Sequence, residues 1–152
     1  MMIVSTKGRY ALRVMIDLSE HGSERYIPLK EISARQEISE KYLESILSVL
    51  SRERLVLAQR GKGGGYRLAR PADGYTVGEI LRSAEGALAP VSCPECLTSS
   101  RAGGRAASCP RSADCKTLPL WQGLSRLIDD YFERVTLAEL ARPATGGTHY
   151  VI

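Results

Sequence analysis

The segment from residue 54 to residue 70 constrains the fold of this chain most strongly, because four glycines separate two short apolar runs there. The apolar runs cover residues 55–58 and 66–69, and a glycine-rich turn between two such runs predicts a β-hairpin. A phosphate-binding loop is disfavoured, since neither a Gly-Lys-Ser/Thr sequence nor a Gly-x-Gly-x-x-Gly helix start occurs there. We therefore expect a short hairpin in this part of the chain.

Three helices are predicted before the hairpin. Residues 5–22 carry apolar side chains at largely helical spacing and end at a glycine. Pro28 suits the first turn of a short second helix, and Ser39 can cap a third helix that spans about residues 40–53. Two short helices joined by a tight turn form a helix-turn-helix, and a hairpin that follows at once makes it a winged helix.

Two capping-box patterns mark short helical segments in the C-terminal half. Thr76 and Glu79 have this spacing before a helix predicted from residue 77 to about residue 85. Thr136 and Glu139 have the same spacing before a last helical turn.

A long helix is predicted to begin at Pro119 and to carry a broad apolar stripe. The residues of the stripe are Trp121, Leu124, Ile128, Tyr131 and Val135, widened by Leu120, Leu127 and Phe132. One small domain cannot easily cover so wide a stripe, so we expect a helix-to-helix dimer. Docking of the stripe on its own domain is the alternative.

The expected fold class is mainly α with a small β-hairpin. A length of 152 residues with 43% hydrophobic content suits one domain with an appended element. We divide the chain into a winged helix-turn-helix domain with the following short helix (1–86), a cysteine-bearing effector loop (87–116), a dimerisation helix with a last turn (117–142), and a tail (143–152).

Neither a membrane span nor a signal peptide is predicted. No apolar run approaches the roughly 20 residues that cross a bilayer. Lys7, Arg9 and Arg13 occupy positions where a signal peptide needs its apolar stretch. We therefore expect a cytoplasmic protein without a membrane partner.

The net charge of +4 is concentrated in the N-terminal half. Residues 1–70 carry 13 Lys and Arg against 8 Asp and Glu, whereas residues 71–152 carry 8 against 9. Five basic residues occur between positions 54 and 70 without one acidic residue: Arg54, Arg60, Lys62, Arg67 and Arg70. Such a local excess is typical of a surface that binds polyanions, with an ordinary solvated basic face as the alternative.

All four cysteines lie between residues 93 and 115. In a chain that is not exported, this clustering indicates a metal or redox site rather than a disulfide framework. Four thiolates are enough for a two-iron cluster and could equally make a tetrahedral zinc site. Unligated thiols that form disulfides under oxidation are a third possibility.

A redox enzyme that uses Cys93 and Cys96 as a C-x-x-C pair is the alternative from a different functional class. Such a pair usually belongs to a thioredoxin-like fold, and this sequence lacks the alternating strand and helix pattern of that fold. No Ser-His-Asp or paired-carboxylate arrangement stands out either. We therefore expect that the chain is not an enzyme.

Four stretches carry a family resemblance: STKGRYAL at 5–12, ISEKYLESIL at 38–47, RGKGGGYRL at 60–68 and LPLWQGLSRLIDDYFERVTLAEL at 118–140. Together they resemble the bacterial winged-helix transcription regulators that include IscR, NsrR and CymR. The resemblance covers nearly the whole chain apart from residues around 97–107. It implies a homodimer that binds partly palindromic, double-stranded operator DNA, with regulation through an iron-sulfur cluster in several branches.

In a helix-turn-helix the second helix enters the major groove, so its outward residues can reach base edges or phosphates. These residues are Lys41, Glu44, Ser45 and Ser48. Phosphates repel a carboxylate unless it accepts a hydrogen bond from cytosine, so Glu44 suggests readout or rejection of particular bases. Similar proteins have a glutamate at the matching position that influences operator choice. The alternative role of Glu44 is to offset the charge of Lys41 or Arg52.

Arg60 lies at the predicted hairpin tip, where a guanidinium can enter the narrow minor groove of an A-T-rich segment. The matching family arginine is used in that way. We expect Lys62 and Arg67 to contact phosphates, and Arg54 and Arg70 only to add to the positive field. Three tyrosines are expected to pack in the core: Tyr10, Tyr42 and Tyr66.

The resemblance also assigns the cysteines. In the cluster-binding branches three cysteines precede the long helix, with five residues between the last two, and Cys109 and Cys115 have that spacing. Cys93 takes the place of the first. One branch of the family has a histidine as fourth ligand where this chain has Leu118. Another branch has an aspartate in the region where this chain has Arg9. The expected ligand set therefore includes the additional thiol: Cys93, Cys96, Cys109 and Cys115.

These observations predict a sequence-specific regulator of transcription. The expected role is a repressor of genes for iron-sulfur assembly, cysteine metabolism or redox stress, which senses through a cysteine-ligated iron-sulfur cluster of the two-iron type. The alternatives are a zinc-stabilised or thiol-based redox regulator, and a cluster-free regulator controlled by a partner protein.

Overall fold

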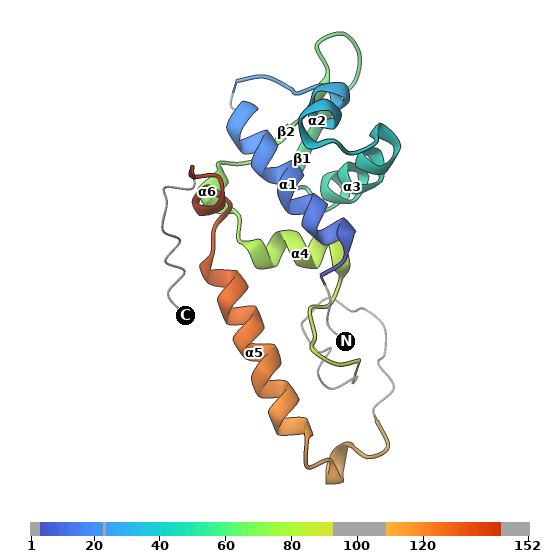
Figure 1. Ribbon diagram of the computed structural model, residues 1–152, viewed down its shortest axis with the longest axis vertical. Coiled ribbons are helices and arrows are strands. Elements are labelled where there is room, and N and C mark those ends of the chain that lie inside the picture. The colour runs from blue at the N-terminus through green and yellow to red at the C-terminus, as the bar shows by residue number, and fades with distance from the viewer. Residues whose placement is uncertain (1–3, 23, 93–108, 144–152) are drawn as a thin grey trace.

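The computed structural model describes residues 4–22, 24–92 and 109–143 of the chain (Figure 1). The elements in chain order are α1 (Thr6–His21), α2 (Leu29–Gln36), α3 (Glu40–Arg52), β1 (Val56–Gln59), β2 (Gly65–Leu68), α4 (Val77–Glu85), α5 (Leu118–Arg134) and α6 (Leu137–Leu140), with short 3₁₀ turns at Ala72–Gly74 and Ser112–Asp114. The predicted fold class, a mainly helical winged helix with one hairpin and a long C-terminal helix, is confirmed. Cys93 and Cys96 lie outside the described residues.

Side-chain caps explain where the N-terminal helices begin. The Ser5 hydroxyl accepts a hydrogen bond from the Lys7 N–H at 3.1 Å at the start of α1. The Ser39 hydroxyl accepts one from the Tyr42 N–H at 3.3 Å at the start of α3. Each hydroxyl accepts from an N–H group of the first turn, for which the helix offers no carbonyl four residues earlier.

The two predicted capping boxes differ from each other. At α6 the box is complete, because the Thr136 N–H donates to Glu139 Oε2 at 2.8 Å and the Glu139 N–H donates to Thr136 Oγ1 at 3.2 Å. At α4 the Glu79 N–H donates to the Thr76 hydroxyl at 3.1 Å, but the carboxylate of Glu79 pairs with Arg70 instead of completing the box. The competing cation therefore explains why only half of the motif forms at α4.

The wing is the antiparallel pair β1 and β2, in which Gln59 lies opposite Gly65. Relative to the prediction, β1 is shifted one residue later and β2 one residue earlier. Ile27 adds a bridge on the other side of β2, with hydrogen bonds of 2.8 and 2.9 Å to the backbone of Tyr66. A Cβ atom at residue 65 would lie 2.1 Å from the Ile27 carbonyl oxygen, so the glycine permits this close approach and pairing extends to it.

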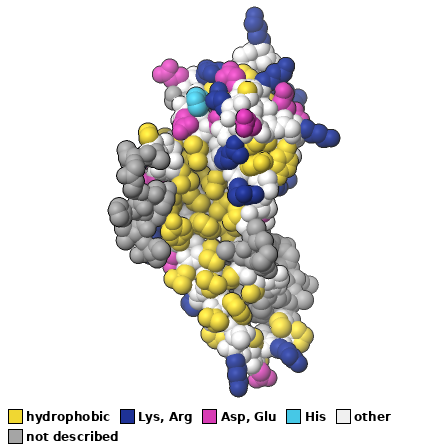
Figure 2. Space-filling view, viewed as in Figure 1, with side chains coloured by type: hydrophobic (Ala, Val, Ile, Leu, Met, Phe, Trp, Pro, Cys, Tyr) yellow, Lys and Arg dark blue, Asp and Glu magenta, His cyan; other side chains and the backbone are white. Residues whose placement is uncertain are grey.

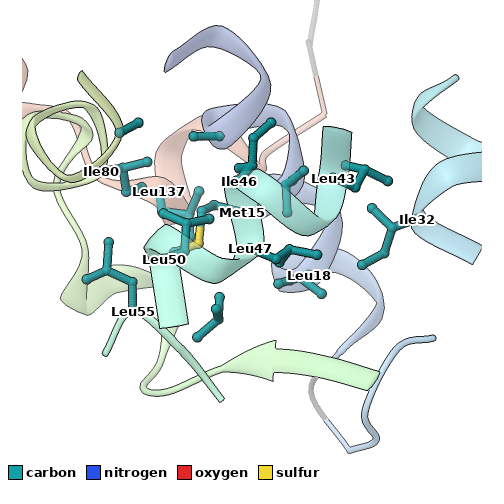
Figure 3. Packing of buried hydrophobic residues seen from close by; sticks show 14 of the residues in the cluster. Met15, Leu18, Ile32, Leu43, Ile46, Leu47, Leu50, Leu55, Ile80 and Leu137 are labelled. Atoms are coloured by element: carbon teal, nitrogen blue, oxygen red, sulfur yellow. The ribbon is translucent and has the colours of Figure 1, made fainter. Parts of the chain in front are cut away.

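One hydrophobic core joins α1, α2, α3, α4 and α6 beneath the wing (Figure 3). Its labelled members are Met15, Leu18, Ile32, Leu43, Ile46, Leu47, Leu50, Leu55, Ile80 and Leu137. Tyr75 is also fully buried, and its hydroxyl donates to the Leu55 carbonyl at 2.7 Å and accepts from the Arg70 N–H at 3.0 Å. Burial raises the pKa of Tyr75, so the hydroxyl keeps its proton and this donor role.

The end of α4 fixes the start of α1. Glu85 Oε1 accepts hydrogen bonds from the Ser5 N–H at 2.9 Å, the Ser5 hydroxyl at 2.6 Å and the Gly8 N–H at 2.9 Å. A Cβ atom at residue 8 would lie 2.3 Å from this oxygen, so glycine is needed there. The carboxylate thus satisfies N–H groups at the positive end of α1.

Helix α5 extends away from the rest of the described chain, and only its C-terminal end meets α4 (Figure 1). Phe132 and Val135 pack there against a small cluster of Val77, Leu81 and Leu88. Farther along α5, four large apolar side chains are exposed: Leu120 (62%), Leu124 (38%), Leu127 (68%) and Tyr131 (42%). The predicted apolar stripe is therefore split between an intramolecular contact and an open face. In the described parts of the chain, no helix has the length and apolar character of a membrane span.

Candidate nucleic-acid interface

Helix α3 divides its side chains between the core and solvent. The buried side carries Leu43, Ile46, Leu47 and Leu50. The exposed side carries the four residues predicted to reach DNA, which are Lys41, Glu44, Ser45 and Ser48. At 3.6 residues per turn these four side chains share one face of the helix. In the free protein the Ser45 hydroxyl donates to the Tyr42 carbonyl at 2.7 Å.

The turn between α2 and α3 sets the angle of the helix-turn-helix. Glu37 takes the left-handed backbone conformation there, with φ 54° and ψ 42°. The Ser33 hydroxyl donates to the Ile38 carbonyl at 2.6 Å and ties the end of the turn back to α2. A side chain other than glycine in this conformation is strained, so the packing on either side must hold the turn in place.

A buried carboxylate holds α2 against α1. Asp17 is 1% exposed and accepts hydrogen bonds from Arg35 Nε at 2.8 Å, Arg35 Nη2 at 2.7 Å and Gln36 Nε2 at 3.0 Å. Burial alone raises the pKa of Asp17, but the hydrogen bonds from Arg35 and Gln36 outweigh it and hold the pKa below its ordinary value. This contact was not predicted from the sequence. Its signal was an acidic residue on the apolar side of α1, between Val14 and Leu18.

The turn of the wing presents Arg60 and Lys62 to solvent, as predicted. Gly61 and Gly63 have positive φ angles of 88° and 74°, which glycine adopts without strain, and they allow the chain to reverse there. At the end of the molecule that carries the wing, several Lys and Arg side chains are exposed, interspersed with Asp and Glu side chains (Figure 2). Two exposed cations thus lie on the turn of the wing, which projects from the body of the domain (Figure 1).

The other basic residues of the wing are held by intramolecular contacts. The guanidinium of Arg67 lies over the ring of Tyr26, with 4.8 Å from Cζ to the ring centroid, and its side chain is half-buried. The guanidinium of Arg70 pairs with Glu79 and lies 4.1 Å from the centroid of Tyr75. Arg70 therefore has a structural role in addition to its charge.

The three tyrosines are partly buried against the core, as expected: Tyr10, Tyr42 and Tyr66. The rings of Tyr10 and Tyr42 meet edge to face with 5.8 Å between centroids. Their packing links α1 to the start of α3.

Two of the four predicted ligand cysteines belong to the described residues. Cys109 and Cys115 are both half-buried and flank the short turn Ser112–Asp114 that precedes α5. The Ser112 N–H donates to the Cys109 carbonyl at 3.0 Å, and Cys115 Sγ lies 3.5 Å from Thr117 Oγ1. Among the described residues, no three His, Cys, Asp or Glu side chains are grouped as metal ligands, and Cys93 and Cys96 fall outside that part of the chain.

A helix-turn-helix with an exposed recognition face, a basic wing and a separate long helix defines a winged-helix DNA-binding protein. The Rrf2 family model, described as an iron-dependent transcriptional regulator, matches residues 4–143. The chain belongs to the Rrf2 family of transcription regulators, which confirms the resemblance noted from its motifs.

Relatives of known sequence are similar over almost the whole chain. The transcription regulator IscR of Erwinia tasmaniensis is 37% identical over 139 residues, which are 91% of this chain and 78% of that protein. The protein rrf2 of Nitratidesulfovibrio vulgaris is 35% identical over 144 residues, which are 95% of this chain and 90% of that protein. The family description and the name of the IscR relative are those of transcription regulators rather than enzymes, in agreement with the expectation for this chain.

Solved structures give the same assignment. CymR, the global cysteine regulator of B. subtilis, superposes with a TM-score of 0.69 at 33% identity, covering 93% of this chain and 97% of its own. IscR from T. potens superposes with a TM-score of 0.69 at 32% identity, covering 96% of this chain and 93% of its own.

Proposed function

We propose that the protein is a cytoplasmic homodimeric repressor that binds a partly palindromic operator. Its targets would be genes for iron-sulfur assembly, cysteine metabolism or redox stress. The observation that carries this proposal is the exposed polar face of α3 beside a basic wing. In a winged helix these two features reach the major groove and the neighbouring backbone or minor groove of one half-site.

The residues of this surface have distinct proposed roles. The exposed side chains of α3 contact base edges and phosphates in the major groove: Lys41, Glu44, Ser45 and Ser48. Glu44 selects among operators, because its carboxylate is repelled by phosphates and is tolerated only where cytosine can donate to it. Arg60 enters the minor groove from the tip of the wing, while Lys62 and Arg67 bind phosphates. Tyr26 would hold Arg67 in one orientation for that contact.

The open face of α5 supports the proposed homodimer. Leu120, Leu124, Leu127 and Tyr131 follow one another at steps of four, three and four residues. Such spacing places the four exposed side chains on one line along the helix, as at a coiled-coil seam. In the space-filling view the hydrophobic side chains continue from the middle of the molecule down α5 (Figure 2). A second copy of α5 would cover them.

The cysteines support an iron-sulfur cluster of the two-iron type as the sensing group. Thiolates are the ligands that such clusters prefer, and the four proposed ligands are Cys93, Cys96, Cys109 and Cys115. Cys109 and Cys115 fit this role because both thiols are half-buried in the segment that leads into α5. A bound cluster would supply a redox-sensitive centre at the base of the dimer helix.

Selection of duplexes from a random-sequence library by the purified protein tests the proposed DNA function. We expect an inverted repeat, bound with an affinity that falls steeply as salt rises because counterions are released from phosphates. Binding without sequence preference would contradict the proposal.

Glu44→Ala in the same selection tests operator choice. The variant should accept a broader set of sequences with little loss on the best one, as expected when a residue acts by rejection. Glu20→Ala, which removes the same charge from an exposed position on α1, is the control. An equal loss of affinity on all operators would argue against this role for Glu44.

A further inference from the structure

The C-terminal end of α5 is attached to the DNA-binding domain at one point of the backbone. The Val77 N–H donates to the Val135 carbonyl at 2.9 Å, and the Leu137 N–H donates to the Tyr75 carbonyl at 3.0 Å. Leu137 is fully buried in the core. These contacts fix where α5 ends, but two hydrogen bonds at one end of a helix do not fix the direction in which the helix leaves.

A group of charged residues on α4 and α5 holds that direction. Arg82 Nη1 lies 3.6 Å from Asp129 Oδ1, and Arg82 Nη2 pairs with Glu133 Oε1. Glu133 Oε2 also accepts a hydrogen bond from the Thr76 hydroxyl at 2.9 Å. A Cβ atom at Gly78 would lie 2.7 Å from Glu133 Oε1, so the two helices approach closely here. We refer to Arg82, Asp129 and Glu133 as the Arg82 clasp.

The Arg82 clasp lies on the opposite side of α5 from the open apolar face. Asp129 and Glu133 are one turn apart, and at 100° per residue both lie roughly opposite the line that carries Leu124 and Leu127. Helix α5 is therefore held by its own domain on one side and offers its apolar residues to a partner on the other. The direction set by the clasp then determines how each DNA-binding domain is placed in a dimer.

The length of α5 makes this direction important for DNA. At a rise of about 1.5 Å per residue, roughly 17 Å separates Asp129 from the start of the helix, so a tilt of about 10° moves that start by about 3 Å. Successive base pairs of DNA are about 3.4 Å apart. A small change of angle at the clasp is thus comparable with a shift of one base pair between two half-sites.

We infer that Arg82 is a positioning residue that determines which half-site spacing the dimer accepts. The inference rests on the proposed function, since it requires a dimer that binds an inverted repeat. The apolar contacts of Phe132 and Val135 also hold α5, but apolar packing is non-directional, whereas ion pairs to two carboxylates one turn apart resist tilting.

The exposure of the clasp predicts that it can be removed without unfolding the domain. The side chains of Arg82, Asp129 and Glu133 are 28%, 30% and 44% exposed, and ion pairs that reach solvent add little to the free energy of unfolding. A loss of positioning can therefore be separated from a loss of structure.

The experiment compares full-length wild type with Arg82→Gln on the selected operator and on operators whose spacer is shortened or lengthened by one or two base pairs. Fluorescence anisotropy gives Kd for each duplex and for a duplex with a single half-site. In Arg82→Gln we expect the ratio of Kd between altered and best spacers to fall by about three- to fivefold, which corresponds to roughly 0.6 to 1 kcal/mol. Affinity for the single half-site should stay unchanged.

Three further variants complete the test. Arg82→Lys should restore part of the spacer preference, because an ammonium can still pair with one carboxylate. Arg126→Gln removes the same charge from an exposed position on α5 and should keep the wild-type ratio. The double variant Asp129→Asn/Glu133→Gln removes the two carboxylate charges of the Arg82 clasp and leaves Arg82 in place. It replaces Arg82→Gln in the experiment if that variant does not fold.

The outcomes separate the two proposals. A folded clasp variant that keeps the wild-type spacer preference overturns the role of Arg82, as does equal loss of affinity on the whole operator and on the single half-site. A wild type that binds no inverted repeat instead refutes the proposed function on which this inference rests.

Discussion

The guanidinium of Arg35 makes a two-point contact with the buried carboxylate of Asp17, with 2.8 Å from Nε to Oδ2 and 2.7 Å from Nη2 to Oδ1. The side chain of Arg35 is 29% exposed and that of Asp17 only 1%. The contact fixes the orientation of α2 on α1, because a two-point pair restrains rotation as well as distance. The recognition helix α3 follows α2 after a short turn, so its position depends on this pair.

Asp17→Asn should lower the free energy of unfolding by roughly 2 to 3 kcal/mol, less than for a fully buried pair because Arg35 reaches solvent. The pKa of Asp17 is lower in the folded state than in the unfolded chain, where it is about 3.9. The charge of Asp17 therefore contributes fully to the free energy of unfolding above the unfolded pKa, and this contribution is lost as pH falls through the folded pKa. Urea denaturation between pH 7 and pH 3 should therefore show the difference between wild type and variant shrinking below about pH 5. A difference that is constant over this range would show that the charge of Asp17 does not contribute.

Glu31→Gln is the control for this pH dependence. The hydrogen bonds from Arg25 lower the pKa of Glu31 as well, but these groups lie at the surface. We expect the pH-dependent change in the free energy of unfolding to have the same sign for Glu31→Gln but to be smaller. Added salt should reduce this change more strongly at Glu31 than at Asp17.

Glu37→Gly should stabilise the protein by about 0.5 to 1 kcal/mol, because glycine adopts the left-handed conformation without the steric cost that glutamate has there. The greater conformational entropy of glycine in the unfolded chain offsets part of this gain. The φ angle of Glu37 is 54°. Ala34→Gly, at an exposed position in the middle of α2, is the matched control and should destabilise by about 1 kcal/mol. Equal destabilisation by both glycines in urea denaturation would contradict strain at residue 37.

Arg60→Ala should weaken binding to the selected operator by about 1 to 3 kcal/mol if the side chain occupies the minor groove. The loss should be largest on operators with an A-T-rich segment under the wing, because the narrow groove there attracts a guanidinium most strongly. Arg126→Ala removes the same charge from α5, far from the wing, and should leave the affinity nearly unchanged. Operator titrations that do not distinguish Arg60→Ala from wild type would exclude the residue from the interface.

Leu124→Lys combined with Leu127→Lys should convert the proposed dimer to monomers and weaken operator binding sharply. Like charges would then meet in an apolar seam, and each half-site would be bound alone. The choice of Leu127 follows from the structure, since Ile128 is half-buried whereas Leu127 is 68% exposed. Light scattering measures the mass, and Asp130→Lys on the flank of α5 is a control with the same total change in charge. A double variant that remains dimeric would place the interface elsewhere.

Substitution of the cysteines tests the proposed cluster. In protein purified without oxygen, Cys93→Ala, Cys109→Ala or Cys115→Ala should abolish the visible absorption of an iron-sulfur cluster, and Cys96→Ala should weaken or shift it. Ser112→Ala, in the turn between Cys109 and Cys115, should keep the absorption because it retains the backbone N–H that donates to the Cys109 carbonyl.

Metal and sulfide analysis of the same samples distinguishes the alternatives. Colourless protein with stoichiometric zinc would show that the cysteines form a structural zinc site instead of an iron-sulfur site. Protein without any metal would leave the cysteines as thiol sensors or as residues without a sensing role.

Local chemistry made much of the fold predictable. Ser39 and Thr76 cap helices where their sequence context predicted, and Gly86 ends α4 with a positive φ of 86°. These signals act within a few residues, so sequence spacing is enough to detect them. The exposed face of α3 was predictable for the same reason, since helical periodicity assigns each residue to a side.

Contacts between distant elements were not predictable in this way. The one-residue shift of the wing depends on Ile27, about forty positions before Gly65 in the chain. The pairing of Arg82 with Glu133 joins α4 to α5 across the cysteine segment. No periodicity or cap motif encodes such pairs, because charged residues at a surface have many acceptable partners until the fold brings two of them together.

The division of α3 into a buried and an exposed side has a consequence for how such regulators diverge. Substitutions at Glu44, Ser45 or Ser48 do not disturb the leucines and isoleucine on the other side, so with the proposed role in DNA binding they would change the affinity for DNA at little cost to folding. After gene duplication, a copy can therefore acquire a new set of target promoters through a few point mutations while its scaffold stays intact. Selection can act on the regulatory network at these positions independently of selection for a stable protein.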